Sequence, residues 1–155
     1  MKRNRVAGIV IRDNVVLVMR RVNKGDEYCA FPGGGQEEGE TFEQTVVREI
    51  DEETTLKVKP GKLLYHIVWD TGDENFFYLC EYLAGEPQLR IDSEEFEQME
   101  DGDQVYEPRW MEIEKLSSLK LYQLEVRDLF LKDYKNGFPE HVQELFIKFA
   151  DRRQI

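Results

Sequence analysis

The segment FPGGGQEEGETFEQTVVREIDEETTL, residues 31–56, places three glycines in front of a run that mixes glutamates with apolar residues. Thr41 and Gln44 have the spacing of a capping box, in which each side chain bonds to the backbone of the other residue. Phe42, Val46 and Ile50 then recur at the spacing of one helical face. The pattern predicts a short strand halted at Pro32, a flexible glycine loop at residues 33–35, and a helix that begins after Thr41.

Three glutamates share one face of the predicted helix. At about 100° per residue, Glu52 lies roughly 60° to one side of Glu49, and Glu53 lies roughly 40° to the other. Val46 and Ile50 fall beside them, so the glutamates border the apolar side of the helix instead of lying opposite it. Two carboxylates about 5 Å apart repel each other by on the order of 3 kcal/mol at an effective dielectric constant near about 20. A positive charge is needed to offset this repulsion.

The crowded glutamates indicate a bound divalent cation. One arginine cannot neutralise three carboxylates, and oxygen ligands are those that Mg²⁺ prefers, with Mn²⁺ as a substitute. The preceding glycines support this interpretation, because backbone without side chains can approach a metal and a phosphate closely. The alternative is a surface helix whose glutamates are protonated or paired with arginine.

The same segment resembles the signature of the Nudix hydrolases, G-x5-E-x7-R-E-U-x-E-E-x-G-U, where U is a bulky aliphatic residue. The matching positions are Gly34, Glu40, Arg48, Glu49, Ile50, Glu52, Glu53 and Leu56. Thr55 stands where the signature has glycine. Glycine after a helix commonly adopts the left-handed conformation, which is costly for a β-branched residue, so we expect a differently built turn at Thr55.

The resemblance implies a fold and an activity. The expected fold is α/β, an α/β/α sandwich with a curved mixed β-sheet, formed by one domain over residues 1–155. The expected activity is the metal-dependent hydrolysis of a diphosphate linkage in a nucleoside diphosphate derivative, such as a nucleoside triphosphate or a nucleotide sugar.

The resemblance also implies roles for individual residues. The expected metal ligands are Glu49, Glu52, Glu53 and the carbonyl group of Gly34. Arg48 is expected to pair with Glu40 or with a metal-binding glutamate and so to fix its position. Glu52 is the first choice for the catalytic base. A base from a downstream loop is the alternative in this family, and the sequence offers Glu94, Glu95 and Glu97 there.

Candidate substrate-binding residues lie just ahead of the glycines. Arg20, Arg21, Tyr28 and Phe31 could contact the phosphates or the base of a nucleotide. Farther along the chain, four aromatic residues at 69 and 76–78 are candidates either for the core or for a wall that stacks on a nucleobase.

The rest of the chain predicts strands around the glutamate helix. Apolar β-branched and aromatic runs predict hairpins at 5–22 and 63–83 and a further strand at 104–113. Helices are predicted at 121–135, where Asn136-Gly137 ends the pattern, and at 139–151. Residues 91–104, with seven acidic side chains, are predicted to form a solvated loop. Two terminal helices and the central helix would then cover both faces of the sheet.

Composition restricts the partners. The formal net charge of -11 over 155 residues argues against a nucleic acid polymer or an anionic membrane, because both attract basic surfaces. A phosphorylated small molecule remains compatible when a cation accompanies it. Two cysteines are too few for a disulfide framework, and Arg12 and Asp13 interrupt the first apolar run. We therefore expect a cytoplasmic protein, monomeric or homodimeric.

A second functional hypothesis remains open. A domain with this fold could have lost turnover and instead sense a nucleotide-like ligand or bind a protein partner. Thr55 and the long acidic segment are the features that favour this alternative.

Overall fold

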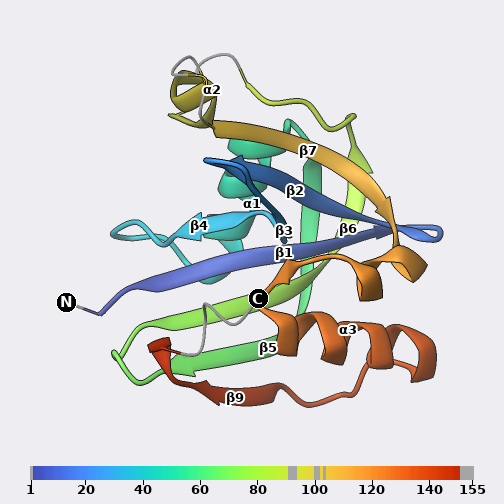
Figure 1. The fold of residues 1–155 in the computed structure, drawn as a ribbon. Coiled ribbons are helices and arrows are strands. Elements are labelled where there is room, and N and C mark those ends of the chain that lie inside the picture. Colours follow the sequence, from blue (N-terminus) through green and yellow to red (C-terminus); the bar gives the residue numbers. More distant parts are fainter. Residues whose placement is uncertain (1, 91–93, 100–101, 103, 151–155) are drawn as a thin grey trace.

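The structure is a computed structural model that describes residues 2–90, 94–99, 102 and 104–150. Within these residues a nine-stranded mixed sheet has the order β8-β3-β2-β1-β6-β5-β9, while β4 also pairs with β1 and β7 also pairs with β2 (Figure 1). The strands are β1 (Asn4–Arg12), β2 (Val15–Asn23), β3 (Asp26–Ala30), β4 (Gly33–Gly35), β5 (Lys57–Trp69), β6 (Glu74–Ala84), β7 (Gln104–Glu112), β8 (Leu121–Tyr122) and β9 (Gln143–Ile147). The helices are α1 (Phe42–Thr54), α2 (Glu94–Met99) and α3 (Leu124–Asn136), with a 3-10 helix at Ile113–Ser118.

Helices cover both faces of the sheet. On one face, Val46 and Ile50 of α1 pack against the sheet core. On the other face, Val126 and Phe130 of α3 pack against a separate cluster of sheet residues. This arrangement confirms the predicted α/β/α sandwich with its curved mixed sheet. None of the described helices has the length and apolar character needed to cross a membrane.

The predicted hairpins and the strand at 104–113 are also confirmed, but the first hairpin opens into a fork. β1 and β2 pair only next to their turn, through Ile11 with Val16 and Arg12 with Val15. Farther from the turn, β1 pairs with β4 and β6, whereas β2 pairs with β3 and β7. The two strands therefore diverge away from their turn, as Figure 1 shows.

The glycine segment corrects one prediction. Residues 33–35 form β4, paired antiparallel with β1, instead of a flexible loop. A side chain at Gly33 would lie 2.3 Å from the carbonyl oxygen of Val6 and 2.5 Å from the Cα atom of Ala7. Gly33 is thus required because the backbones of β4 and β1 approach each other closely there.

The predicted helix at 139–151 is wrong. Residues 143–147 form β9, which pairs parallel with β5. Ile147 is buried and Leu145 packs against the core, whereas Glu144 and Phe146 are exposed. This alternation has the period of a strand with one buried face, and the free edge of β5 supplies its partner.

Thr55 also differs from expectation. It adopts the left-handed conformation directly, with φ 64° and ψ 1°, and its backbone N–H donates to the carbonyl oxygen of Asp51. Its hydroxyl group donates to the carbonyl oxygen of Glu86 at 3.0 Å. The turn is therefore built as it would be with glycine, and the side-chain hydrogen bond offsets part of the cost of this geometry.

The acidic segment is only partly a loop. Residues 94–99 form the short helix α2, and residue 104 begins β7. Residues 91–93, 100, 101 and 103 lie outside the described part of the chain, so the prediction of a solvated loop is not tested there.

Candidate active site

Local sequence fixes the orientation of α1. The backbone N–H of Gln44 donates to the hydroxyl oxygen of Thr41 at 3.1 Å, and the N–H of Thr41 donates to the Gln44 side chain at 2.9 Å. This is the predicted capping box. Gly8 of β1 permits close packing, because a Cβ atom there would lie 2.4 Å from Cδ1 of Ile50. α1 is thus held against β1 with its glutamate face near β4.

Arg48 connects the glutamates to β4. Its guanidinium group donates to both oxygens of Glu40, with Nε 2.6 Å from Oε2 and Nη2 3.0 Å from Oε1. Nη1 lies 2.9 Å from Glu49 and 3.4 Å from Glu52, and Nη2 donates to the carbonyl oxygen of Gly35 at 3.0 Å. The pairing of Arg48 with Glu40 and with a glutamate of the signature is therefore present.

Glu40 is held in its charged form. Besides Arg48, the backbone N–H of Glu37 and the hydroxyl group of Thr45 donate to its carboxylate, at 2.9 and 3.1 Å. The hydrogen bond from Arg48 is the main reason that the pKa of Glu40 falls from 4.5 to about 2. Glu40 in turn raises the pKa of Arg48. Both groups stay ionised at neutral pH and anchor the network.

Glu49 lies directly against the glycine strand. A Cβ atom at Gly34 would be 2.3 Å from the carboxylate carbon of Glu49, so only glycine leaves room for this side chain. The guanidinium group of Arg5 on β1 interacts electrostatically with Glu49 and with Glu53. Burial lowers the pKa of Arg5, while the charges of Glu53 and Glu49 act in the opposite direction.

The site has an excess of negative charge. Five glutamates interact with two arginines. Arg48 contacts Glu37, Glu40, Glu49 and Glu52. The charges of Glu49 and Glu53 act on Arg5. Carboxylates of this kind fit a hard divalent cation by chemistry. Among the described residues, however, no three acidic, histidine or cysteine side chains are grouped closely enough to form a metal centre. Glu49 and Glu52 instead contact Arg48, and Glu52 is 55% exposed.

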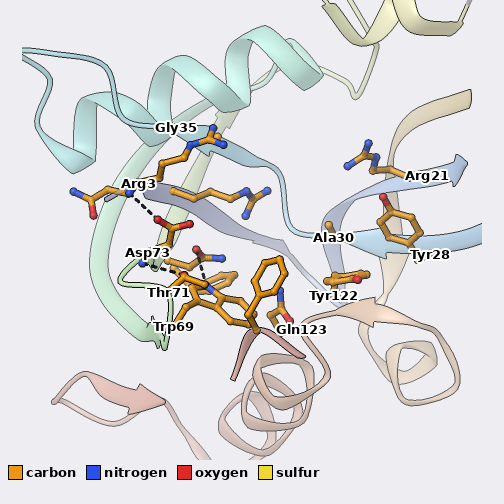
Figure 2. A pocket seen from close by; sticks show the side chains of 16 residues that line it. Arg3, Arg21, Tyr28, Ala30, Gly35, Trp69, Thr71, Asp73, Tyr122 and Gln123 are labelled. Atoms are coloured by element: carbon orange, nitrogen blue, oxygen red, sulfur yellow. Dashed lines mark hydrogen bonds between the residues drawn. The ribbon is translucent and has the colours of Figure 1, made fainter. Parts of the chain in front are cut away.

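A cavity of about 490 Å³ lies beside this network, in the fork between β1 and β2. Figure 2 shows Arg3, Gly35 and Asp73 on one side of it and Arg21, Tyr28 and Tyr122 on the other. Gly34, which touches Glu49, is part of its wall. The cavity therefore adjoins Glu49 of α1 across Gly34.

Aromatic rings form two parts of the wall. Trp69 and Phe149 meet edge to face with ring centroids 6.5 Å apart, and the indole N–H of Trp69 donates to Asn75 at 3.2 Å. Tyr28 and Tyr122 meet with centroids 5.2 Å apart. Planar rings with polar groups beside them can hold a nucleobase or a sugar.

The arginines in the cavity differ from those elsewhere. The six other arginines in the described residues each form an ion pair with a carboxylate: Arg12, Arg20, Arg48, Arg90, Arg109 and Arg127. Arg3, Arg5 and Arg21 line the cavity, and none has a carboxylate oxygen of a described residue within ion-pair distance. In a protein with a net charge of -11, arginines that lack a direct ion pair are suited to bind an anionic ligand, although the charges of Glu49 and Glu53 also act on Arg5.

Arg21 is held with one donor free. Its Nη2 atom donates to the hydroxyl oxygen of Tyr106 at 2.7 Å, and its guanidinium carbon lies 4.5 Å from the centre of that ring. The Nε atom is buried and has no hydrogen-bond partner among the described residues. Arg21 and Tyr28, two of the predicted substrate-binding residues, pair across β2 and β3 and both line the cavity. Their contact with a substrate stays a prediction.

Two other predicted substrate residues do not line the cavity. Arg20 points to the opposite side of β2 and pairs with Glu27 at 2.8 Å. Phe31 is 1% exposed and packs edge to face on Phe77 and Phe130 in the core. Side chains alternate between the two faces of β2, so Arg20 faces away from the cavity when Arg21 faces it. Phe31 belongs to the aromatic cluster under α3.

Among the aromatic candidates, Trp69 and Phe77 line the cavity, whereas Phe76 and Tyr78 face α1. Phe76 stacks on Phe42 with centroids 4.2 Å apart. The alternative bases lie on α2, where Glu97 is exposed and the side chains of residues 94–96 are outside the described part of the chain.

Sequence reasoning missed Arg3, Arg5, Tyr122, Gln123 and Phe149 of the cavity wall. The basic residues at the start of β1 were visible in the sequence, but only the fork between β1 and β2 shows that Arg3 and Arg5 face the same space as Arg21.

The fold and the site together define a class, α/β/α proteins in which a carboxylate helix adjoins a cationic, aromatic cavity. Residues 1–133 match a family model described as the NUDIX domain. The chain therefore belongs to the Nudix family, and it is a Nudix-type hydrolase.

Similar proteins agree with this assignment. An ADP-ribose pyrophosphatase of Methanocaldococcus jannaschii is 37% identical over 100 residues, which span 59% of this chain and 58% of that protein. An RNA pyrophosphohydrolase of Pelagibacter ubique is 26% identical over 92% of each chain. The crystal structure of a Nudix hydrolase from Nitrosomonas europaea superposes with a TM-score of 0.71 at 17% identity, covering 94% of this chain and 80% of the other. The last comparison supports the fold alone.

Proposed function

We propose that this protein is a divalent-metal-dependent pyrophosphohydrolase that cleaves a diphosphate linkage in a nucleoside diphosphate derivative. The observation that carries the proposal is the excess of carboxylates on α1 next to a cavity with three arginines, none of which forms a direct ion pair with a described residue. A divalent cation held by the glutamates would connect these two features, because it would neutralise the charge of a bound diphosphate.

Glu49, Glu52 and Glu53, with the carbonyl group of Gly34, would hold Mg²⁺ or Mn²⁺. When bound, the cation supplies neutralisation of the diphosphate and a lower pKa for a water ligand. Arg48 positions Glu49, because it is anchored by two hydrogen bonds to Glu40. Arg48 also competes for Glu49 and Glu52, so metal binding has to weaken these contacts.

Glu52 remains the first choice for the base that takes the proton from the attacking water. Of the two proposed metal ligands that contact Arg48, Glu52 has the more exposed side chain, at 55% against 15% for Glu49, and the longer contact, at 3.4 Å. A weakly held, solvent-facing carboxylate can accept a proton and pass it to bulk water. Glu97 of α2 is the alternative whose side chain the structure describes as exposed.

The cavity would bind the rest of the substrate. Arg5, on which the charges of Glu49 and Glu53 act, would neutralise part of the diphosphate charge. The Trp69–Phe149 and Tyr28–Tyr122 pairs would offer apolar surfaces for base or sugar. The relatives are named for ADP-ribose and for RNA, so a test panel should include both. For RNA the scissile group would be a 5′-terminal polyphosphate. The assay therefore compares two kinds of substrate, a small phosphorylated nucleotide and the 5′ end of an RNA chain.

The test is a hydrolysis assay with nucleoside triphosphates, ADP-ribose, nucleotide sugars, dinucleoside polyphosphates and 5′-triphosphorylated RNA, in Mg²⁺ or in excess chelator. At least one compound is expected to be cleaved only with the metal. Glu52→Gln and Glu53→Gln are expected to lower kcat by about 100-fold or more. Glu125→Gln, which changes an exposed glutamate of α3, is the matched control and should retain full activity.

Product analysis by ³¹P NMR in H₂¹⁸O would show which phosphorus receives the oxygen. Unchanged cleavage in both glutamate variants, or in chelator, would refute the proposal. A protein that binds nucleotides, as shown by a raised melting temperature, but cleaves none of them would instead be the catalytically silent domain.

A further inference from the structure

The last strand, β9, forms an open edge of the sheet. It pairs with β5 and with no other strand of the described chain, at the end of the strand order opposite β8 (Figure 1). An unpaired strand edge presents rows of N–H and C=O groups that can pair with another strand.

Backbone alternation shows which residues face this edge. The carbonyl oxygen of Ile147 accepts a hydrogen bond from the N–H of Asp70 at 3.2 Å, and the N–H of Phe149 donates to the Asp70 side chain at 2.9 Å. Odd-numbered residues of this stretch therefore direct their backbone groups toward β5. The backbone groups of Glu144, Phe146 and Lys148 consequently point away from the sheet.

The side chains of the same three residues are exposed. Phe146 is 77% exposed, the highest value for a large hydrophobic residue in the described part of the chain. Glu144 is 57% exposed on one side of it, and Lys148 is exposed on the other. An edge with charges of one sign would repel a second copy. This edge instead has a negative charge at Glu144 and a positive charge at Lys148, each two residues from Phe146.

We propose that β9 pairs antiparallel with β9 of a second copy of this chain, about a two-fold axis through Phe146. In this register Phe146 faces Phe146 of the second copy, and Glu144 faces its Lys148. All of these are hydrogen-bonded positions of an antiparallel ladder, because their backbone groups point outward in both copies. A register that sets Glu144 opposite Glu144 would place like charges together, which disfavours it.

The proposed contact is short, so the dimer should be weak. A five-residue strand buries less than the roughly 800 Å² per partner of a standard interface. The net charge of -11 on each copy opposes association at long range. Dimerisation should therefore be concentration-dependent, and raising the salt from low to about 0.15 M should strengthen it by screening.

The test is sedimentation velocity from about 1 to about 500 µM protein, which spans the expected micromolar dissociation constant. The natural chain should shift from monomer to dimer. Phe146→Thr, which keeps strand propensity, should weaken dimerisation by about tenfold or more. Leu83→Thr, at another exposed hydrophobic residue with 55% exposure, is the matched control and should not change it.

A charge exchange tests the register. Glu144→Lys should weaken the dimer by about tenfold because two attractive pairs become repulsive, and the double change Glu144→Lys with Lys148→Glu should restore it. Circular dichroism would verify that each variant is folded. A monomer at every concentration, a dimer insensitive to Phe146→Thr, or a double variant as weak as Glu144→Lys would overturn the proposal. None of these outcomes depends on the hydrolase activity.

Discussion

Arg48 has more carboxylate partners than one positive charge can balance. Its two bonds to Glu40 fix the guanidinium plane, and only Nη1 then reaches Glu49 and Glu52. The geometry separates the glutamates into two groups. Glu40 is the anchor and accepts hydrogen bonds from Arg48, Glu37 and Thr45, whereas Glu49 and Glu52 each contact Arg48 through its Nη1 atom alone, at 2.9 and 3.4 Å.

The anchor predicts a pH-dependent contribution to stability. Because the pKa of folded Glu40 is about 2 instead of 4.5, its charged form stabilises the fold fully above about pH 4.5, and this stabilisation is lost as the pH falls toward 2. Glu40→Gln should lower the free energy of unfolding by about 1 kcal/mol near neutral pH, as expected for a pair bordering solvent. Urea denaturation at several pH values should show the difference from the natural chain shrinking below about pH 4.5.

Glu125→Gln measures the background of replacing an exposed glutamate in the same experiment. A stability difference between the natural chain and Glu40→Gln that stayed constant from about pH 7 to about pH 3 would contradict the anchoring role.

Arg21 and Arg20 form a natural pair for testing the cavity. They are adjacent on β2, but Arg21 lines the cavity whereas Arg20 pairs with Glu27 on the other face. Arg21→Gln should raise KM for the preferred substrate by about tenfold, the loss expected for one charge-assisted hydrogen bond, with a smaller effect on kcat. Steady-state kinetics of Arg20→Gln should match the natural chain. Equal effects of the two substitutions would show that Arg21 does not contact the substrate.

At the scale of elements, a helix or strand could be predicted from the sequence when the residues that determine it lie close together in the chain. α1 follows from a capping box and an apolar stripe within 14 residues, so the sequence specifies it. β9 does not follow in this way, because Val142, Leu145, Phe146 and Phe149 also fit helical spacing. The edge of β5 selects the strand over the helix, and its residues lie 78 positions before their partners in β9, such as Tyr65 and Gln143.

The cavity was only half predictable for the same reason. Arg21 and Tyr28 could be chosen because they precede the glycines, but Arg3 and Arg5 enter only where β1 leaves β2 and pairs with β4. The metal ligands, the catalytic base and a single domain over 1–155 remain predictions.

A buried hydrogen bond joins three elements of the α3 face. The hydroxyl group of Tyr65 on β5 donates to Asp133 of α3 at 2.8 Å, and the Gln143 side chain of β9 donates to the same carboxylate oxygen at 2.7 Å. Burial and this carboxylate both raise the pKa of Tyr65. Tyr65→Phe would leave a nearly buried carboxylate with one donor fewer, and should lower the free energy of unfolding by about 1 to 3 kcal/mol.

Chemical denaturation is the measurement, and Tyr134→Phe is the matched control. Tyr134 is 38% exposed and its hydroxyl group contacts the carbonyl oxygen of Asp13 at 3.3 Å. Its loss should change stability by no more than about 0.5 kcal/mol. If Tyr65→Phe were equally mild, Asp133 would have to be satisfied by other donors.

At the scale of the whole molecule, two electrostatic effects can be separated. The net charge of -11 destabilises any compact state by general repulsion, which monovalent salt screens. The excess of carboxylates around Arg48 and Arg5 is a local effect, which only a bound cation would relieve. NaCl and MgCl₂ at equal ionic strength should therefore differ in their effect on the melting temperature.

MgCl₂ at about ten times its dissociation constant should add about 1.4 kcal/mol, or about 3 to 5 °C in Tm, beyond NaCl of the same ionic strength. The double variant Glu49→Gln with Glu53→Gln should keep the response to NaCl and lose the additional response to Mg²⁺, because only the local site is changed. Differential scanning calorimetry can measure both responses without any substrate. An undiminished Mg²⁺ effect in the double variant would place the ion elsewhere on this acidic chain and would remove α1 as its binding site.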